Sequence, residues 1–226
     1  MNRPAAVVFL AAITLLAGCK KQVNASTRAS VTPVDALPAP APAAIPVDAA
    51  TSSPDADPPS IDVGLSVDQA YASIPHRRTA WTESQTTVPA DERAYLRTIF
   101  IVVDEAIAVR VAGLQNFSQQ RFDSIDVDGQ FDRLISFTRS MPVPARLSAY
   151  HRQILAALSN DRQFFAEWRV QGANFPDARQ IAANGNVQAA SAAAHAAYSE
   201  LMSKYPAESQ QNKDAFFDYH CALDFL

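Results

Sequence analysis

The chain has 226 residues, of which 48% are hydrophobic, 19% charged and 9% aromatic. This composition excludes a wholly disordered chain, and the six glycines exclude collagen-like and Gly-rich classes. The formal net charge is −4 and the sequence has no polybasic run, which argues against a protein that binds nucleic acid. We therefore expect a globular core and no nucleic-acid partner.

Residues 1–18 have the features of a secretory signal peptide. Arg3 supplies the charged start, and an apolar run of about a dozen residues follows from Ala5 to Leu16. A transmembrane helix needs about 20 apolar residues, and Lys20 comes too early for that length. The pattern therefore predicts a signal peptide rather than a membrane-spanning helix.

The four residues Leu16-Ala17-Gly18-Cys19 resemble the lipobox of bacterial lipoprotein precursors. Small residues fit the narrow site of the signal peptidase, and only a thiol can take diacylglycerol as a thioether. The resemblance implies cleavage before Cys19 and acyl chains, such as palmitate, that hold the protein on a membrane at about 0.8 kcal/mol per buried methylene. Lys20 resembles the residue that sorts enteric lipoproteins to the outer membrane. A plain secreted protein, in which Cys19 follows Gly18 by chance, is the alternative.

Residues 19–60 have the composition of a linker, because proline alternates with Ala, Ser, Thr and Val and no aromatic residue occurs. Ala-Pro repeats favour polyproline II, which forms a semi-rigid spacer. Some 40 such residues reach roughly 120 Å at about 3.1 Å per residue. The linker suggests a domain that contacts a partner away from its own membrane, and clearance from the lipid surface is the simpler alternative.

Residues 61–226 have apolar side chains at helical spacing, and Gly and Pro fall at the expected element boundaries. We predict an all-α fold, an up-and-down bundle of four to five helices. The predicted helices are 66–73, 89–119, 129–139, 144–171, 177–205 and 208–226.

Three local features of these helices leave alternatives open. The helix 89–119 is apolar on several faces, including Ile99, Ile101, Val102 and Val109, and is expected to be the central one, although a strand over 99–103 is also compatible. The helix 177–205 is expected to kink or split at Asn184-Gly185-Asn186. Its Ala-rich part, 189–197, either closes the bundle or receives another chain.

The link 74–81 contains the densest polar and aromatic cluster: His76, Arg77, Arg78 and Trp81. Arginine offers planar bidentate donors and tryptophan a stacking face, so the cluster is a candidate site for an anion or an acidic partner. In the alternative, Trp81 closes one end of the bundle and the two arginines pair with acids of neighbouring helices.

Three histidines, His151, His195 and His220, are expected on or near the inward faces of three different helices. A bundle can bring such residues together around a metal or a haem, but no ligand motif supports this, so each is first interpreted as a hydrogen-bonded core residue. Lipidation of Cys19 leaves Cys221 without a partner in this chain, for which we expect burial rather than an intermolecular disulfide.

Several acidic residues have structural interpretations. The segment from Ser124 to Asp132 resembles part of an EF-hand loop, but it lacks the first Asp and the final Glu, so a helix-capping turn is the better interpretation. Asp104 or Glu105 is expected to pair with an arginine. Asp161 lies near the apolar face of its helix and is a candidate for a buried pair with an arginine.

The sequence contains no phosphate loop, nucleophile elbow or zinc signature, and we expect neither an enzyme nor a cofactor. The hypothesis is a lipid-anchored envelope protein. Its domain faces the periplasm and contacts a protein partner in an accessory, scaffolding or inhibitory role. The alternative is a periplasmic helical bundle that binds a small ligand, a metal or haem through some of the four histidines.

Overall fold

The structure is a computed structural model that describes residues 58–172 and 177–224. The predicted signal peptide, Cys19, most of the predicted linker and Leu226 lie outside the described residues. Every regular element within the described ranges is helical, as the sequence predicts. The elements are α1 (Val67–Ala72), η2 (Glu83–Gln85), α2 (Ala90–Ser118), α3 (Val127–Ser140), η3 (Ala145–Leu147), α4 (Ser148–Gln171), α5 (Ala178–Ala183), α6 (Gly185–Lys204) and α7 (Gln210–Leu223).

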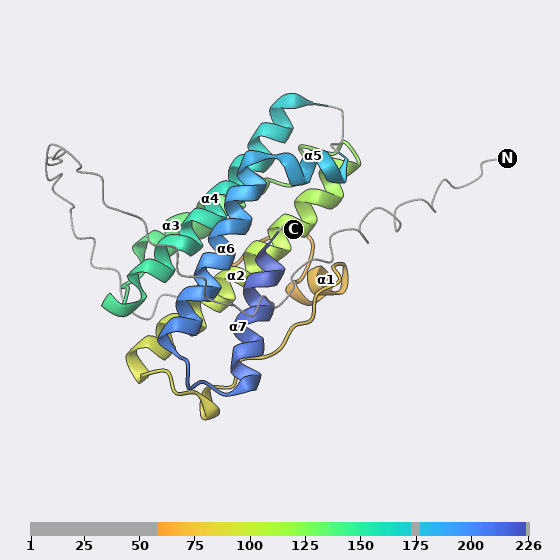
Figure 1. Cartoon of the computed structure of the whole chain (residues 1–226). Helices are drawn as coiled ribbons and strands as arrows, with labels where there is room; N and C mark the ends of the chain where they lie inside the picture. The colour runs from red at the N-terminus through yellow and green to blue at the C-terminus, as the bar shows by residue number, and fades with distance from the viewer. Residues whose placement is uncertain (1–57, 173–176, 225–226) are drawn as a thin grey trace, which may run out of the picture.

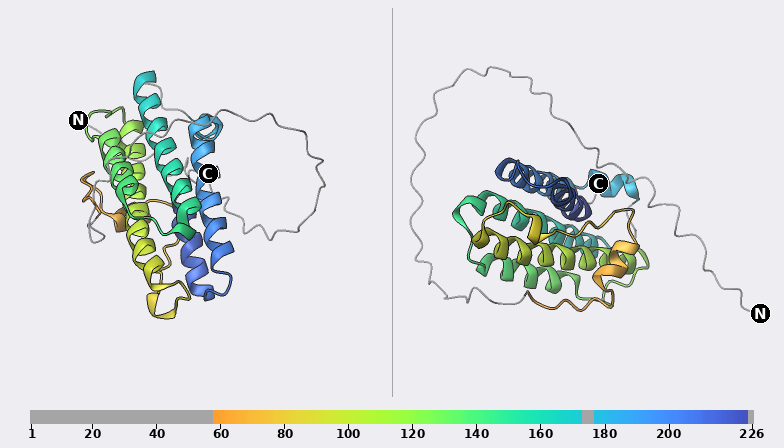
Figure 2. Two further views of the ribbon diagram at one scale, coloured as in Figure 1. Left: turned by 90° about the vertical axis from the view of Figure 1, so that its left-hand side faces the viewer. Right: turned by 90° about the horizontal axis from the view of Figure 1, so that it is seen from below.

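Five of these helices form a closed ring (Figures 1 and 2). Helix α2 packs against α3, α3 against α4, α4 against α6 and α6 against α7, and α7 returns to α2. Short connections make successive helices antiparallel, so the predicted up-and-down bundle is confirmed. The short helix α1 lies against α2, and α5 lies against α6.

The helix boundaries follow the capping residues of the sequence. Ser66 begins α1 with a capping box, in which its hydroxyl accepts from the N–H of Gln69 and the Gln69 side chain accepts in return. Asn184 ends α5 and caps α6 through its side-chain oxygen. The predicted break in the helix 177–205 is thus confirmed as a split, because an asparagine side chain replaces the missing backbone partners.

Helix α2 is the central helix, since it contacts α1, α3, α4 and α7. Ile99, Val102 and Val109 share one side of α2, Leu96 and Ile107 lie on another, and all five are completely buried. Ile101 departs from the expectation, because its side chain points outward and is 41% exposed. The alternative strand over 99–103 is wrong, since α2 continues through these residues.

Small residues let the helices approach closely at two places. The buried alanines of α6 pack in the most extensive helix pair of the bundle, α4 against α6, so this face closes the bundle. At Gly113 of α2, an added Cβ would lie 2.7 Å from Cε1 of Phe165 in α4. The core therefore depends on the absence of a side chain at Gly113.

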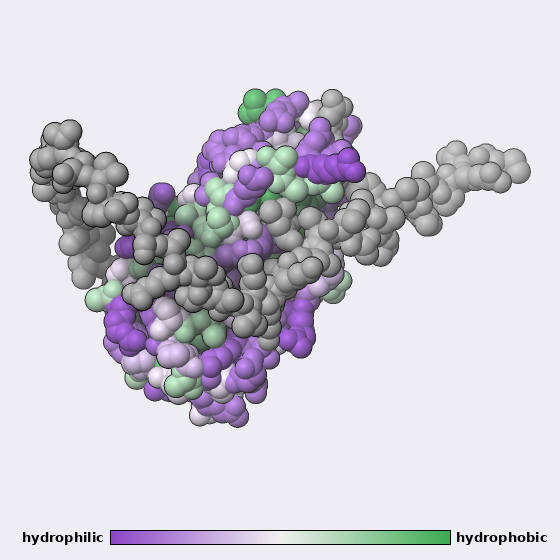
Figure 3. All heavy atoms as spheres, in the orientation of Figure 1, coloured by the Kyte–Doolittle hydropathy of each residue, from purple (hydrophilic) through white to green (hydrophobic). Residues whose placement is uncertain are grey.

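The outer surface of the described part is mixed in character. The face drawn in Figure 3 is mostly hydrophilic, with scattered apolar side chains. None of the helices in 58–172 and 177–224 combines the length and the apolar character needed to cross a bilayer.

A Gly113→Val substitution tests the close approach of α2 and α4. We expect it to lower the free energy of unfolding by about 1–3 kcal/mol, because the new side chain overpacks the Phe165 ring. Urea unfolding followed by circular dichroism measures the change. Gly185→Ala is the matched control, since nothing lies within 4 Å of its added Cβ, and its stability should stay within about 1 kcal/mol of wild type. Equal losses in both variants would contradict the packing argument.

Candidate functional site

The link between α1 and α2 holds all four of the expected site residues and lies against α7. Arg78 contacts Asp68 at 2.7 Å and Asp104 at 2.5 Å. The Nε of Arg77 lies 3.5 Å from a carboxylate oxygen of Asp218 in α7, and the Arg77 side chain is 73% exposed. Both arginines therefore pair with acids of neighbouring helices, as the second interpretation of this cluster expects.

Trp81 packs against α2, as expected for a residue that covers part of the bundle. Its ring meets the Phe100 ring edge to face, with centroids 5.4 Å apart. The indole Nε1 is buried and has no hydrogen-bond partner. A buried N–H without an acceptor costs free energy. The ring contact of Trp81 with Phe100 therefore stabilises the bundle, whereas burial of its indole N–H does not.

His76 lies beside Cys221 near the end of α7, with 3.6 Å between Nδ1 and Sγ. Burial lowers the pKa of His76, and the positive charge of Arg110 lowers it further. The expected burial of Cys221 is confirmed, and its sulfur is disulfide-bonded. This sulfur therefore offers no nucleophile to His76.

The structure does not bring His151, His195 and His220 together. His220 donates from Nδ1 to the carbonyl of Phe216, since a carbonyl can only accept, and Nε2 then accepts from the Tyr150 hydroxyl at 3.2 Å. Burial lowers the pKa of His220 to about 4, so the ring is neutral at pH 7. His151 has its own partner, because its Nδ1 lies 2.8 Å from the hydroxyl of Tyr95.

His195 corrects the expectation of an inward histidine, because its side chain is 61% exposed. Its Nε2 lies 2.8 Å from a carboxylate oxygen of Asp224, which is itself buried at the C-terminal end of α7. Within the described ranges, no group of three or more His, Cys, Asp or Glu side chains is placed to hold a metal ion.

Three buried ionisable side chains interact inside the bundle: Arg110 of α2, Asp161 of α4 and Asp224 at the end of α7. Arg110 of α2 donates to the carbonyl of Leu223 at 2.7 Å and to that of Ala222, so it holds the last turn of α7. Asp161 of α4 is completely buried, and neither of its carboxylate oxygens has a hydrogen-bond partner. The expected contact of Asp161 with an arginine is thus not formed as a hydrogen bond, and Arg110 acts on Asp161 through its charge alone.

The environment of Asp161 favours its neutral form. Burial raises the pKa of Asp161 to about 8, although the charge of Arg110 lowers it and Asp224 raises it. Sequence reasoning noticed Asp161 but missed Arg110 and Asp224. The available signal was Arg110 itself, a charge in a helix that is apolar on most faces.

The acidic turn before α3 caps that helix, as the sequence indicates. Asp126 accepts from the N–H of Gly129 at 3.0 Å. Two neighbouring acids form ion pairs with α4, because Asp128 contacts Arg169 at 3.1 Å and Arg162 contacts Asp132 at 2.6 Å. These contacts assign the turn to helix capping and packing.

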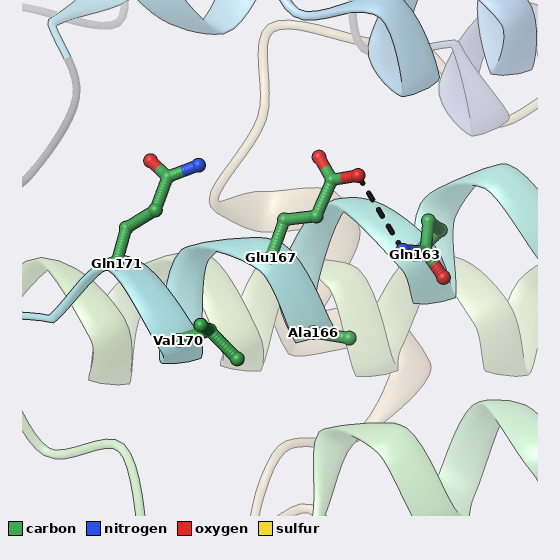
Figure 4. A pocket seen from close by; sticks show the side chains of 5 residues that line it. All are labelled: Gln163, Ala166, Glu167, Val170 and Gln171. Carbon is green, nitrogen blue, oxygen red and sulfur yellow. Dashed lines mark hydrogen bonds between the residues drawn. The ribbon is translucent and has the colours of Figure 1, made fainter.

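A separate shallow hollow of about 240 Å³ lies on the outer face of α4 (Figure 4). One helix supplies all of its lining, which includes Val170, a side chain that is 87% exposed. The polar contact within it is a long one, 3.4 Å from Gln163 to Glu167. None of the candidate site residues contributes to this hollow.

Comparison with models of known protein families, with curated proteins and with solved structures finds no match for this chain. Its function is therefore argued from its own residues. What those residues build is a set of internal contacts in which the irregular link before α2 and the buried Arg110 hold α7 in place.

An Asp161→Asn substitution tests the protonation of the buried cluster. In the unfolded chain Asp161 ionises near pH 4, and in the folded protein it ionises at about 8. Between these values the folded protein keeps a proton that the unfolded chain loses, so rising pH favours unfolding. The stability due to this proton is complete below about pH 4 and is lost as the pH rises to about 8.

We expect the wild type to lose up to about 1 kcal/mol per pH unit relative to Asp161→Asn between pH 5 and 8. Chemical unfolding at four pH values measures the difference. Asp132→Asn is the matched control, because this carboxylate pairs with Arg162 at the surface, and its curve should run parallel to that of wild type. A parallel curve for Asp161→Asn would show that Asp161 is ionised throughout.

Proposed function

We propose that this protein is a lipid-anchored component of the bacterial cell envelope whose helical domain acts by contact with another protein. The observation that carries the proposal is Leu16-Ala17-Gly18-Cys19 directly after an apolar run of signal-peptide length. Acyl chains on Cys19 anchor the protein to a membrane, and Lys20 favours the outer membrane. The domain faces the periplasm and has an accessory, scaffolding or inhibitory role.

The linker supports a role in presentation. Its Pro/Ala-rich composition over 19–60 provides a semi-rigid spacer that separates the domain from the lipid surface. A domain that acts on its own membrane needs no such length, whereas one that contacts a partner across the periplasm does. Arg77 of the link also supports an interaction role, because its side chain is 73% exposed.

The first test concerns the anchor. Cells grown with labelled palmitate should label the wild-type chain and the Cys221→Ala control, and a Cys19→Ala variant should remain unlabelled. Mass spectrometry should find an N-terminal peptide that begins at Cys19 and carries diacylglycerol. In membrane fractionation the wild type should sediment with membranes, because two or three acyl chains make release very slow.

The disulfide of Cys221 defines the result that would contradict lipidation of Cys19. The chain has two cysteines, Cys19 and Cys221, and one sulfur cannot carry both a thioether lipid and a disulfide. A peptide pair in which Cys19 is joined to Cys221, together with absence of label, would overturn the anchor and leave a secreted protein.

The second test concerns the partner. Crosslinking in cells, followed by affinity purification, compares the native chain with Cys19→Ala. We expect one envelope protein to be enriched only with the anchored chain, since anchoring fixes where the domain can reach. Equal enrichment with both chains, or enrichment of nothing, would contradict presentation by the anchor.

A further inference from the structure

Residues 77–88, here called the strap, lie along α7 in an extended course, with one short turn, η2, near their middle. The strap runs antiparallel to α7: Thr79 meets Asp218, Thr82 meets Asn212, and residues 86–87 meet Glu208. In Figure 1 the strap is the segment that descends from α1 beside α7. We define the strap face as the side chains that receive it, which are Phe100, Glu208, Asn212 and Asp218.

The strap face binds main chain. Asn212 accepts from the N–H of Thr82 at 2.8 Å and donates to the carbonyl of the same residue at 3.1 Å. Asp218 accepts from the N–H of Thr79 at 3.0 Å, and Glu208 from the N–H of Thr87 at 2.9 Å. Contacts of this kind hold any extended segment, because every residue except proline offers the same N–H.

The same carboxylates also select hydroxyl side chains. Asp218 accepts from the hydroxyl of Thr79, and Glu208 accepts from those of Thr86 at 2.8 Å and Thr87 at 3.0 Å. Burial alone would raise the pKa of Glu208, but hydrogen bonds from Asn212, Thr86 and Thr87 outweigh it and hold the pKa below its ordinary value. Glu208 is thus ionised and ready to accept.

The receiving side chains are buried under the strap. Asn212 is completely buried, Glu208 is 4% exposed and Asp218 is 6% exposed. The strap itself supplies part of this burial, so its removal exchanges its hydrogen bonds for hydrogen bonds to water. The strap face therefore has the chemistry of a site that an extended, hydroxyl-bearing chain can occupy.

The strap is an imperfect occupant of this face. Trp81 places its ring on Phe100, but its indole N–H is buried with no acceptor. The Arg77 contact with Asp218 is long, at 3.5 Å, and largely exposed. An aromatic residue without a buried donor would make the same ring contact at lower cost.

We propose that the strap face is a peptide-binding site that the strap occupies in cis, and that the partner supplies an extended, hydroxyl-rich segment with one aromatic residue that replaces the strap. This inference rests on the proposed function for the source of the segment, namely an envelope protein. The binding itself is measured with purified full chain in detergent, so loss of the lipid anchor and failure of the site give different results.

The probe is a fluorescent peptide with the strap sequence RRTAWTESQTTV, residues 77–88. A Trp81→Ala chain loosens the cis strap and leaves the strap face intact. We expect it to bind the peptide at least tenfold more tightly than wild type. Gln85→Ala, an exposed position of the same strap, is the matched control and should bind like wild type.

Two further variants show where the peptide binds. Adding Asn212→Ala to Trp81→Ala should weaken binding at least tenfold, because the main-chain contact is lost. In a Thr82→Cys/Gln211→Cys chain a short bis-maleimide can join the strap to α7, since the native side chains lie 2.9 Å apart. The crosslinked chain should not bind the peptide, and the same chain without crosslinker should.

Circular dichroism verifies that each variant is folded. If Trp81→Ala loses helical signal, Thr79→Ala, which removes one hydroxyl contact, becomes the deciding variant, with at least threefold tighter binding expected. Absence of peptide binding by a folded, loosened chain overturns the proposal. Binding that neither Asn212→Ala nor the crosslink reduces overturns it as well.

Discussion

The structure depends on how the bundle satisfies the polar groups of its central helix. The middle of helix α2 is enclosed by neighbouring helices, so the charge of Arg110, which is 3% exposed, cannot reach water. Arg110 meets this constraint by donating to the last carbonyls of α7, the end at which the helix dipole is negative. Removal of these acceptors would take two hydrogen bonds from a buried charge, which commonly costs several kcal/mol. The position of α7 in the ring is therefore fixed by electrostatics as much as by apolar packing.

Once α7 is fixed, the polar side chains on its strap-facing side determine the course of the link. Asp104 on α2 holds Arg78, and Asp218 and Asn212 on α7 hold the strap. The cluster of His76, Arg77, Arg78 and Trp81 is thus a connection between α1 and the helices α2 and α7.

The sequence predicted the helices well because their signals are local. Capping at Ser66 and the break at Asn184 depend on neighbouring residues, and each of them was identified from the sequence alone. The site was harder to predict because its partners are distant in the sequence: Thr79 and Asp218 are 139 positions apart. His195 was expected on or near an inward face but is exposed, because the alanines around it are compatible with either face. Asp161 was noticed through its apolar neighbours, whereas its environment depends on residues from α2 and α7 that no local pattern reveals.

The distance along the chain between Arg110 and its acceptors also has a consequence for biogenesis. A chain synthesised from its N-terminus contains Arg110 long before Leu223, which lies 113 positions later. Until α7 is complete, the guanidinium lacks these acceptors and must remain hydrated, so α2 cannot be fully enclosed. The enclosure of the central helix therefore depends on the last residues of the domain to be made.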